Sequence, residues 1–378
     1  MKDSPSCVTL NILSDLATPH NNSLFRALSA MPGLRLNLYY AMSVWAGLPW
    51  KDSFHDAVGK AQIFGEKRIN FGLLWYALRH RREKFLLVGW ANPTVRAILV
   101  VFWILRRPFM FWSDHPDESR SRSFLKALVR RCFFHMVRVR ASHVFGVGKH
   151  TVRYFEGVGF PPEKLINLPI FIEVGDRPEG FAERRREVRA RYDVLDDEVL
   201  YVAASRFIHA KGFDLLIRAA AQIDRSLLKR FRLLLVGHGP EESAIRRLIA
   251  EHGLGDRVII EAWMEPAQFE ATVASADVFV HPARFDAFGG GTLHAMAAGV
   301  PVIGSEGAGT VVERVEHGVN GLIFRNENVG ELAAHLAHFL AHPEGIPQMG
   351  AEARKTAEAW PPERGARILY GAVRGEAA

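Results

Sequence analysis

Cysteine is scarce and no long hydrophobic run is present, and both features limit what this protein can be. Cys7 and Cys132 are the only cysteines among 378 residues, so the sequence indicates neither a disulfide framework nor a cysteine-bound metal. The apolar run at residues 97–105 has nine residues, whereas a membrane-spanning helix needs about twenty, and Pro93 in the preceding "NPT" predicts a buried helix instead. The N-terminal residues lack the pattern of a signal peptide, so we expect a protein of the reducing cytoplasm.

Acidic residues are scarce in one part of the chain. Residues 60–153 hold 19 Lys and Arg against 5 Asp and Glu, whereas the remaining residues hold 29 against 36. Such a basic region predicts an anionic partner, either nucleic acid or a membrane surface. The sequence has no zinc-finger spacing, no aromatic RNA-binding signature and no basic heptad region, so we expect no nucleic-acid partner. An anionic membrane face is the remaining candidate.

One segment of this basic region predicts an amphipathic helix. Phe71, Leu74, Trp75 and Leu78 recur at the spacing of a helical face. Five basic residues surround this face: Lys67, Arg68, Arg79, Arg81 and Arg82. A helix with an apolar face and a basic collar is typical of membrane-surface binding, but a helix that packs on a core with a solvated outer face would show the same pattern. The sequence leaves both interpretations open.

Apolar runs typical of strands alternate with helical patterns, which is characteristic of parallel sheets covered by helices. In the first half, the strand-like runs lie at residues 8–13, 34–40, 85–89, 108–112 and 143–147. In the second half, they lie at residues 200–204, 232–236, 258–260, 278–281, 302–304 and 322–324. A polar, charged stretch near residues 173–190 predicts the linker between two α/β domains. Ligands of such sheets bind outside the carboxyl ends of the strands, so a cleft between the domains is the expected site.

Three glycines precede a predicted helix in "FDAFGGGTLHAMAAGVPVIGS", residues 285–305. Gly289, Gly290 and Gly291 follow the predicted strand at 278–281, the helix "TLHAMAAG" comes next, and Gly299 ends it. The first amides of a helix lack intrahelical partners, and glycine backbone lets a phosphate approach them closely. A tight turn would also explain the glycines. Their spacing differs from the G-x-G-x-x-G motif, and the chain contains no P-loop.

A second element suited to anions lies upstream, in "YVAASRFIHAKGFDLLIRAA". Arg206 and Lys211 follow the predicted strand at 200–204 and precede a helix that begins near Phe213. Two cations at the carboxyl end of a strand can converge on one diphosphate, although each could also be an ordinary surface charge. Two phosphate-suited elements in one predicted domain, both at carboxyl ends of strands, favour a nucleotide site.

Four segments occur in order over residues 200–324: "SRFIHAKGFDLLIRA", "RLLLVGHGPEESAIRRLIAEHGLGDRVII", "ASADVFVHPARFDAFGGGTLHAMAAGVPVIGS" and "VVERVEHGVNGLIF". This ordered set resembles the nucleotide-sugar-binding domain of GT-B glycosyltransferases, in particular the retaining enzymes of family 4 (glycosyl transferases group 1). The first half is similar more loosely, through "WSDHPDESRSRSFLKALVRR" and "VGKHTVRYFEGVGFPPEKLINLPIFI".

The resemblance implies the GT-B fold, with two Rossmann-like parallel-sheet domains that face each other across a cleft. Residues 1–178 would form the acceptor-side domain, and residues 179–357 would form the domain that binds the nucleotide-sugar donor. A C-terminal helix at about residues 358–378 would cross back and complete the first domain. No Asp-x-Asp triplet occurs in the sequence, so we expect neither an essential metal nor a cofactor apart from a UDP- or GDP-linked donor.

The resemblance also implies roles for residues of the second half. Arg206 and Lys211 match the basic pair that holds the donor diphosphate, where they would stabilise the leaving group. Asp286 matches the first acidic residue of the family's E-x7-E pattern, which contacts hydroxyls of the donor sugar. The loop whose amides meet phosphate and sugar corresponds to Phe288, Gly289, Gly290, Gly291 and Thr292.

Three positions depart from the family pattern or match it loosely. His294 stands where the family has its second glutamate, which accepts bonds from the ribose; neutral imidazole has one acceptor nitrogen, and a packed helix residue is the alternative. His115 matches a histidine near the reacting sugar, with Asp114 as a competitor and a structural histidine as the alternative. Residues 20–22, "HNN", replace a glycine-rich loop and would bind a ligand or cap the next helix.

The sequence therefore predicts a retaining, metal-independent glycosyltransferase, of hexosyltransferase type, that moves a sugar from a nucleotide-sugar to an acceptor hydroxyl. We assign Asp286 and His115 to positioning and charge stabilisation and not to a covalent step. The expected acceptor is a glycan or a lipid-linked intermediate of cell-surface polysaccharide or glycolipid synthesis, reached at the cytoplasmic face of the inner membrane. A GT-B epimerase, a phosphorylase and a non-catalytic nucleotide-binding subunit are the alternatives, the last because Asp and His replace both glutamates.

Overall fold

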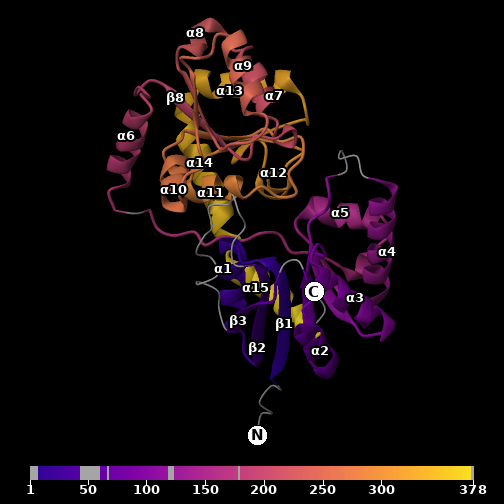
Figure 1. The fold of residues 1–378 in the computed structure, drawn as a ribbon. Coiled ribbons are helices and arrows are strands. Elements are labelled where there is room, and N and C mark those ends of the chain that lie inside the picture. Colours follow the sequence, from indigo (N-terminus) through magenta and orange to yellow (C-terminus); the bar gives the residue numbers. More distant parts are fainter. Residues whose placement is uncertain (1–6, 43–59, 66–67, 118–122, 178, 376–378) are drawn as a thin grey trace. The chain divides into compact units, whose positions relative to one another are not determined.

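The computed structural model describes residues 7–42, 60–65, 68–117, 123–177 and 179–375 (Figure 1). Its internal contacts divide the chain into two compact units. Unit 1 comprises Met1–Glu173 together with Pro361–Ala378, and unit 2 comprises Val174–Trp360. Each unit is built around a parallel sheet, as the sequence predicts.

Unit 1 contains, among the described residues, a seven-stranded sheet in the order β3-β2-β1-β4-β5-β6-β7, and every pairing is parallel. Its strands are β1 (Val8–Leu16), β2 (Leu34–Met42), β3 (Lys60–Ile63), β4 (Lys84–Val88), β5 (Phe109–Ser113), β6 (Ala141–Gly146) and β7 (Leu165–Asn167). The central strands β4 and β5 are mostly apolar because helices bury both of their faces. The sequence does not predict β3 and β7, which are short edge strands with one neighbour each.

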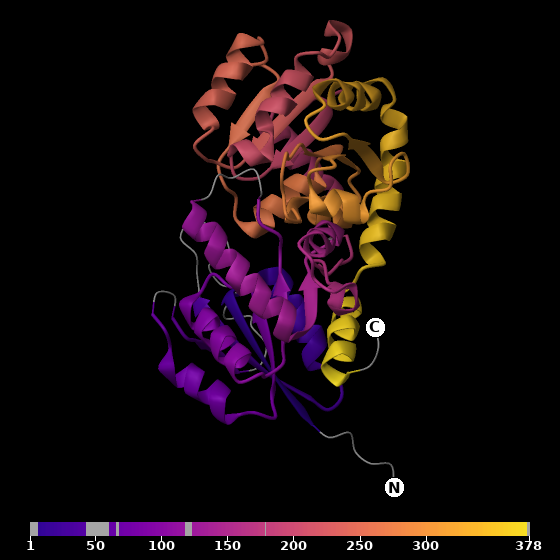
Figure 2. The same ribbon diagram turned by 90° about the vertical axis from the view of Figure 1, so that its right-hand side faces the viewer.

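The helices of unit 1 cover the sheet in two layers. They are α1 (Pro19–Ser29), α2 (Phe71–Arg79), α3 (Pro93–Ile104), α4 (Phe124–Arg140), α5 (Lys149–Gly157) and α15 (Pro362–Arg374). The chain runs from β1 outward to β2 but from β4 in the opposite direction to β7, so right-handed crossovers place α1 on one face and α3, α4 and α5 on the other. α2 packs beside α3, and α3 packs beside α4. The last helix, α15, packs against α1 and lies with unit 1 (Figure 2).

Unit 2 contains, in the part of the chain that is described, a six-stranded parallel sheet in the order β10-β9-β8-β11-β12-β13. Its strands are β8 (Val199–Ala204), β9 (Phe231–Val236), β10 (Val258–Glu261), β11 (Val278–His281), β12 (Val302–Ser305) and β13 (Gly321–Phe324). Its helices are α6 (Phe181–Arg191), α7 (Phe213–Ala220), α8 (Arg225–Leu228), α9 (Glu242–Glu251), α10 (Pro266–Ala274), α11 (Gly290–Ala298), α12 (Gly309–Arg314), α13 (Val329–Ala341) and α14 (Ile346–Glu358). Two apolar clusters fill its interior, with the sheet between them.

The linker prediction for residues 173–190 is wrong over most of that segment, because α6 begins at Phe181 and belongs to unit 2. This helix has no buried residue, so its sequence lacks the apolar stripe that normally reveals a packed helix. Charge contributes instead: Arg185 and Arg189 contact the two carboxylate oxygens of Asp277, at 2.5 and 2.8 Å, and Val188 packs against the apolar cluster. Most of this charged stretch, which has few apolar residues, is therefore a docked helix and not a connection.

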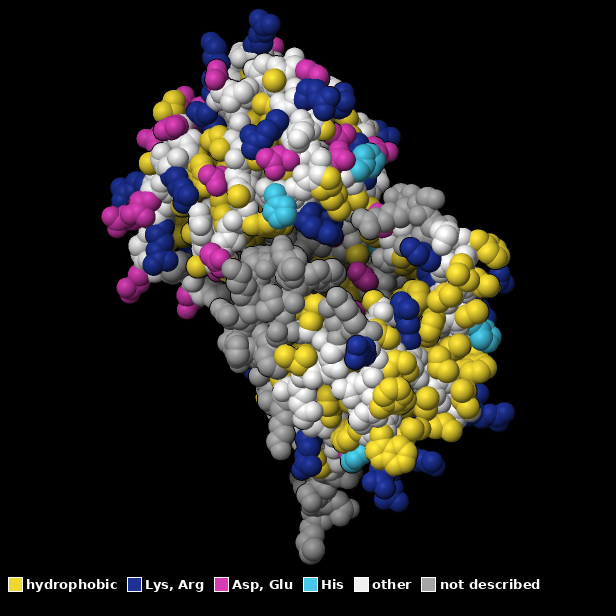
Figure 3. Space-filling view, in the orientation of Figure 1, with side chains coloured by type: hydrophobic (Ala, Val, Ile, Leu, Met, Phe, Trp, Pro, Cys, Tyr) yellow, Lys and Arg dark blue, Asp and Glu magenta, His cyan; other side chains and the backbone are white. Residues whose placement is uncertain are grey.

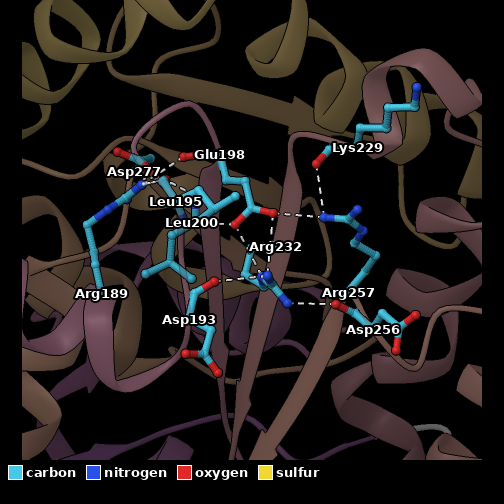
Figure 4. Close-up of polar contacts among 10 residues, drawn as sticks. All are labelled: Arg189, Asp193, Leu195, Glu198, Leu200, Lys229, Arg232, Asp256, Arg257 and Asp277. Atoms are coloured by element: carbon cyan, nitrogen blue, oxygen red, sulfur yellow. Dashed lines mark hydrogen bonds and ion pairs between the residues drawn. The ribbon is translucent and has the colours of Figure 1, made fainter.

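A second group of charges lies at the amino ends of the strands of unit 2 (Figure 4). Glu198, which precedes β8, has a side chain that is only 3% exposed. Arg257 lies 2.7 Å from its Oε1 atom, Arg232 lies 3.4 Å from its Oε2 atom, and the amide of Leu195 donates to Oε2 at 2.9 Å. These contacts tie the starts of β8, β9 and β10 together at the edge of the sheet opposite the carboxyl ends.

Within the residues that the structure describes, no helix combines the length and the apolar character needed to cross a bilayer. The run at 97–105 forms the middle and end of α3, which begins at Pro93 after an Asn92 cap. Ile98, Leu99 and Phe102 of this helix are fully buried against the sheet. The prediction of a helix for this run is therefore confirmed, and its inward side is buried, whereas Ile104 and Leu105 at its end are exposed.

Candidate functional site

The candidate site lies at the carboxyl edge of the sheet of unit 2, where the chain changes direction. From β8 the chain proceeds to β9 and β10 on one side, whereas β11, β12 and β13 lie on the other side. Such a switch point leaves a crevice outside the carboxyl ends of the two central strands. The loop after β8 carries Arg206 and Lys211, and the loop after β11 carries Asp286, so both predicted elements meet at the switch point.

Asp286 is the centre of the polar contacts at this edge. Its Oδ2 atom lies 2.6 Å from Nζ of Lys211 and 3.1 Å from Nε2 of His281, and its side chain is 16% exposed. Burial alone would raise the pKa of Asp286, but the hydrogen bond from His281 and the charge of Lys211 hold it well below its usual range. The carboxylate is therefore ionised, and one of its oxygens is already occupied by protein groups.

The other oxygen of Asp286 keeps capacity for a ligand. The amide of Phe288 donates to Oδ1 over 3.4 Å, which is a long and weak bond. A carboxylate oxygen has two acceptor positions, so Oδ1 can take a strong bond from a hydroxyl donor. The chemistry that suits this arrangement is recognition of a polyol such as a sugar.

His281, the last residue of β11, orients Asp286. Its Nε2 atom faces the ionised carboxylate and therefore carries the hydrogen, so in the neutral ring Nδ1 accepts from the hydroxyl of Thr292 at 2.8 Å. The imidazole thus links Asp286 to the first turn of α11. Gly289 makes room for it: the residue has φ of +94°, and a Cβ atom there would lie 2.1 Å from Cε1 of His281.

The amino end of α11 is suited to an anion. The helix begins at Gly290 with Gly289 as its cap, and it ends at Gly299, which has φ of +77°. The hydroxyl of Thr310 lies within hydrogen-bond distance of the carbonyl oxygens of Phe288 and Gly289 and shares its one hydrogen between them, which fixes the loop that leads into the helix. The amides of the first turn then remain at an end that attracts negative charge. Thr292 is buried within this turn, and its hydroxyl is hydrogen-bonded to His281.

The two predicted cations differ in their surroundings. Lys211 has a side chain that is 12% exposed and is paired with Asp286, whereas Arg206 is exposed on the same loop. Gly212 lets this loop approach the end of β11, because a Cβ atom there would lie 2.1 Å from the carbonyl oxygen of Pro282. A diphosphate at this edge could be bound by Arg206 directly and by Lys211 once its ammonium group exchanges Asp286 for a phosphate oxygen.

His294 lies in α11 and faces α10. Its Nδ1 atom lies 3.8 Å from Oε1 of Glu270, and its ring meets Phe269 edge to face with 5.8 Å between ring centres. Burial lowers the pKa of His294 below its ordinary value, against the opposing charge of Glu270. The imidazole is therefore neutral near pH 7. Its predicted contact with a ribose stays a prediction.

The predicted residues of unit 1 lie at the carboxyl ends of its strands. His115 follows β5, and its Nδ1 atom lies 3.1 Å from the hydroxyl of Thr151, which itself donates to the carbonyl of Val147 at 2.9 Å. The hydroxyl has one hydrogen, so Nδ1 is the donor to it and Nε2 carries the lone pair. Burial, followed by the charge of His150, lowers the pKa of His115 to about 4, with Asp117 opposing.

Unit 1 also contains the other predicted residues, Asp114 and the segment at residues 20–22. Asp114 is exposed beside His115. The segment "HNN" does not provide the cap of α1, because Thr18 does so by accepting from the amide of Asn21 at 3.2 Å. His20, Asn21 and Asn22 belong to the first turn, and a ligand contact by these residues stays a prediction.

Sequence reasoning missed His281 and Thr310. His281 ends an apolar strand, where it resembles an ordinary core residue, and the signal that could have found it is its spacing of five residues to Asp286. Thr310 lies in α12, beyond the motif, and only the fold brings it to the loop. Among the described residues, no group of three or more His, Cys, Asp and Glu side chains could hold a metal ion.

Two Rossmann-like parallel-sheet units, with an anion-suited edge in the second, define the GT-B class of fold. The family model described as "Glycosyl transferases group 1" matches residues 184–356, which are less than half of the chain. The Anabaena protein Alr3699/HepE in complex with UDP has a TM-score of 0.77 at 17% identity, covering 97% of this chain and 100% of that chain.

Two curated relatives are similar over part of their length. The GDP-mannose-dependent alpha-(1-6)-phosphatidylinositol monomannoside mannosyltransferase of Mycolicibacterium smegmatis is 30% identical over 237 residues, which are 60% of this chain and 61% of that protein. The alpha-D-kanosaminyltransferase of Streptomyces kanamyceticus is 28% identical over 234 residues, which are 62% of this chain and 60% of that protein. The chain therefore spans about three fifths of the length of each relative.

Proposed function

We propose that this protein is a glycosyltransferase that moves a sugar from a UDP- or GDP-linked donor to an acceptor hydroxyl, with retention of configuration and without a metal. The observation that carries the proposal is the contact of Lys211 with Asp286 beside the amino end of α11. A cation for a diphosphate and a carboxylate for sugar hydroxyls lie side by side at the switch point. The names of the relatives, a mannosyltransferase and a kanosaminyltransferase, support the reaction class.

In the proposed reaction, the donor diphosphate lies against the first-turn amides of α11, with Arg206 and Lys211 as its cations. Asp286 accepts from hydroxyls of the donor sugar through Oδ1, while His281 holds the carboxylate in place. As the bond between the sugar and the diphosphate breaks, negative charge grows on the leaving group. Fixed amides and cations that face this charge lower the barrier because they need no rearrangement during the step.

We further propose that the acceptor belongs to glycolipid or surface-polysaccharide synthesis at the cytoplasmic face of the inner membrane. Two observations support this: the relative from Mycolicibacterium smegmatis is named as a phosphatidylinositol monomannoside mannosyltransferase, and residues 60–153 carry an excess of basic side chains. His115, neutral at neutral pH, would lie near the reacting sugar. This proposed role of His115 is separate from donor binding, so an experiment that contradicts it leaves the donor-site proposal unaffected.

Donor binding is tested by thermal shift with UDP, GDP, ADP, UDP-glucose and GDP-mannose. One nucleotide should raise the unfolding temperature, because a ligand that binds only the folded state stabilises it by mass action. The variants Lys211→Ala and Arg206→Ala should each bind that nucleotide at least tenfold more weakly than wild type does, since a charge-assisted hydrogen bond contributes about 1.5–3 kcal/mol. Arg218→Ala, a cation of α7 outside the site, is the control.

Turnover is tested by release of nucleoside diphosphate from the stabilising donor in the presence of membrane lipid extract. NMR of the product reports whether the configuration is retained. A protein that binds no nucleotide, or variants that bind as well as wild type does, would remove the donor-site assignment. Binding without turnover in any extract would leave a nucleotide-binding protein and contradict the enzymatic proposal.

A further inference from the structure

Helix α4 is the least buried long helix of unit 1. Of its 17 residues only Val137 is buried, whereas Phe124 is 84% exposed and Leu125 is 67% exposed. Leu128 and Val129, one turn later, are 45% and 36% exposed. Large apolar side chains that recur at i, i+1, i+4 and i+5 form a stripe on one side of a helix, and here no element of the described chain covers that stripe.

The neighbouring helices of the same layer extend this surface. Phe71 and Trp75 of α2 are 74% and 58% exposed, and Ile104 with Leu105 at the end of α3 are 62% and 49% exposed. We define the apolar face by eight residues: Phe71, Trp75, Ile104, Leu105, Phe124, Leu125, Leu128 and Val129. In Figure 3, hydrophobic side chains gather over the α2–α4 side of unit 1 with Lys and Arg side chains among them. Exposed apolar surface of this extent marks an interaction site.

Cations predominate around the apolar face, with Glu83 after α2 as an acidic neighbour. α4 contains Lys126, Arg130, Arg131, Arg138 and Arg140 and no acidic residue. α2 ends in Arg79, whose guanidinium lies over the ring of Trp75 at 5.2 Å, and Arg81 with Arg82 follow it. Lys67 of the predicted collar lies outside the described residues. A surface that combines large apolar side chains with interspersed cations fits the boundary between the headgroups and acyl chains of an anionic bilayer.

An apolar groove joins this face to the carboxyl edge of the sheet. It has a volume of about 470 Å³ and is lined by Trp90 after β4, by Pro116 after β5, and by Leu125, Val129 and Arg130 of α4. Pro116 is the neighbour of His115, so the groove runs from α4 to the loop that carries the candidate site residue of unit 1. A lipid-linked substrate held in a bilayer under α4 would need a path of this kind to reach the edge.

We propose that the apolar face of α2, α3 and α4 binds an anionic lipid bilayer, with Phe124 and Leu125 inserted among the lipids and the cations of α4 at the headgroups. The docking itself follows from exposure and charge. Its purpose, to bring a lipid-linked acceptor to the groove beside His115, rests on the proposed function. The sequence predicts membrane contact by the basic region at 60–153 and singles out one amphipathic helix, at residues 71–78, whereas the structure assigns the larger share to α4.

Co-sedimentation with vesicles tests the docking, using phosphatidylcholine vesicles with and without phosphatidylglycerol. Wild type should bind the anionic vesicles at least tenfold more strongly than the neutral ones, and high salt should weaken this binding because it screens the cations. The double variant Phe124→Glu/Leu125→Glu should lose binding at least tenfold. Leu195→Glu changes a residue of unit 2 that is 62% exposed and should bind as wild type does.

A second pair of measurements separates this proposal from the proposed function. Nucleotide-induced thermal stabilisation, which reports on unit 2, should be unchanged in Phe124→Glu/Leu125→Glu, and a circular dichroism spectrum and urea unfolding curve like those of wild type show that unit 1 folds in this variant. Arg130→Gln/Arg131→Gln should lose the preference for anionic vesicles while it keeps the same stabilisation. Wild type that stays in the supernatant with both vesicle types, or binds equally when Phe124 and Leu125 are charged, overturns the docking whether or not the protein binds a nucleotide.

Discussion

At the scale of single residues, the site is organised around one short carboxylate. The resemblance to group 1 glycosyltransferases implies a glutamate where this chain has Asp286, and the Oδ2 atom of this shorter side chain contacts both His281 and Lys211. His281 in turn needs Gly289 for space and Thr292 for its tautomer. Four residues from two loops, a strand and a helix therefore fix the direction of one oxygen atom.

Two substitutions of His281 can separate its two hydrogen bonds. Glutamine can place an amide near Nε2 and keep the contact with Asp286, whereas asparagine can replace only Nδ1 and its contact with Thr292. We expect His281→Gln to retain most of the kcat/KM of wild type and His281→Asn to lose about tenfold or more, because a hydrogen bond to a charged group contributes about 1.5–3 kcal/mol. Steady-state kinetics with the stabilising donor provides the measurement. Equal losses in both variants would contradict the positioning role.

His115 should make stability depend on pH. In the unfolded chain its pKa is near 6.5, and in the folded protein it is about 4, so between these values the unfolded chain holds a proton that the folded protein lacks. The free energy of unfolding therefore falls as the pH drops from 6.5 towards 4. Urea unfolding at pH 7.5 and at pH 5 should show a larger decrease for wild type than for His115→Gln. The same decrease in both proteins would mean that the folded protein does not keep His115 neutral.

At the scale of elements, the two edges of the unit 2 sheet carry different kinds of polar groups. The carboxyl edge holds the groups suited to a ligand, whereas the amino edge holds Glu198 with Arg232 and Arg257 (Figure 4). Glu198→Gln should lower the free energy of unfolding by about 3 kcal/mol, because it leaves two arginines without their buried carboxylate. Nucleotide affinity should stay unchanged.

The control for this prediction is Glu242→Gln in α9. Glu242 pairs with Arg246 at 2.9 Å, but both side chains are exposed, at 35% and 57%. An exposed pair contributes at most about 1 kcal/mol, so this variant should unfold within that margin of wild type. Chemical denaturation of both variants gives the comparison. Similar stability of the two would show that the amino-edge network is no stronger than a surface ion pair.

The elements that the sequence predicted and missed share a physical pattern. Central strands such as β4 and β9 are apolar on both faces, and α11 is bounded by glycines, so local sequence defines them. The edge strands β3 and β7 and the charged helix α6 carry no such signal, because pairing and ion pairs with distant residues stabilise them. In the site, the motif gave Lys211 and Asp286, but the role of His281 depends on a contact across a turn that no periodicity reveals.

At the scale of the whole molecule, the chain enters unit 1 twice. α15 packs on α1, and Gly365 lies so close to unit 1 that a Cβ atom would be 2.4 Å from Phe171 and 2.8 Å from Leu24. We expect Gly365→Ala to lower the free energy of unfolding of unit 1 by about 1–3 kcal/mol through overpacking. The stability of unit 2, measured through its stabilisation by nucleotide, should be unchanged.

A matched substitution in the same helix should have the opposite sign. A Cβ atom at Gly371 would meet no atom within 4 Å, so Gly371→Ala adds helix propensity without overlap. This change should stabilise unit 1 by about 0.5–1 kcal/mol. Calorimetry of the two variants beside wild type provides the measurement. A loss of stability in both would indicate that α15 tolerates no side chain at either position and would contradict the packing argument.

The return of α15 also has a consequence for biosynthesis. A ribosome completes all of unit 2 before it makes Pro362–Arg374, so the side of α1 that receives this helix stays uncovered while the intervening residues are translated. At about 5–20 residues per second, the wait is on the order of ten seconds or more. Unit 1 therefore cannot complete its packing until all of unit 2 has been made, although its own first residues are translated first.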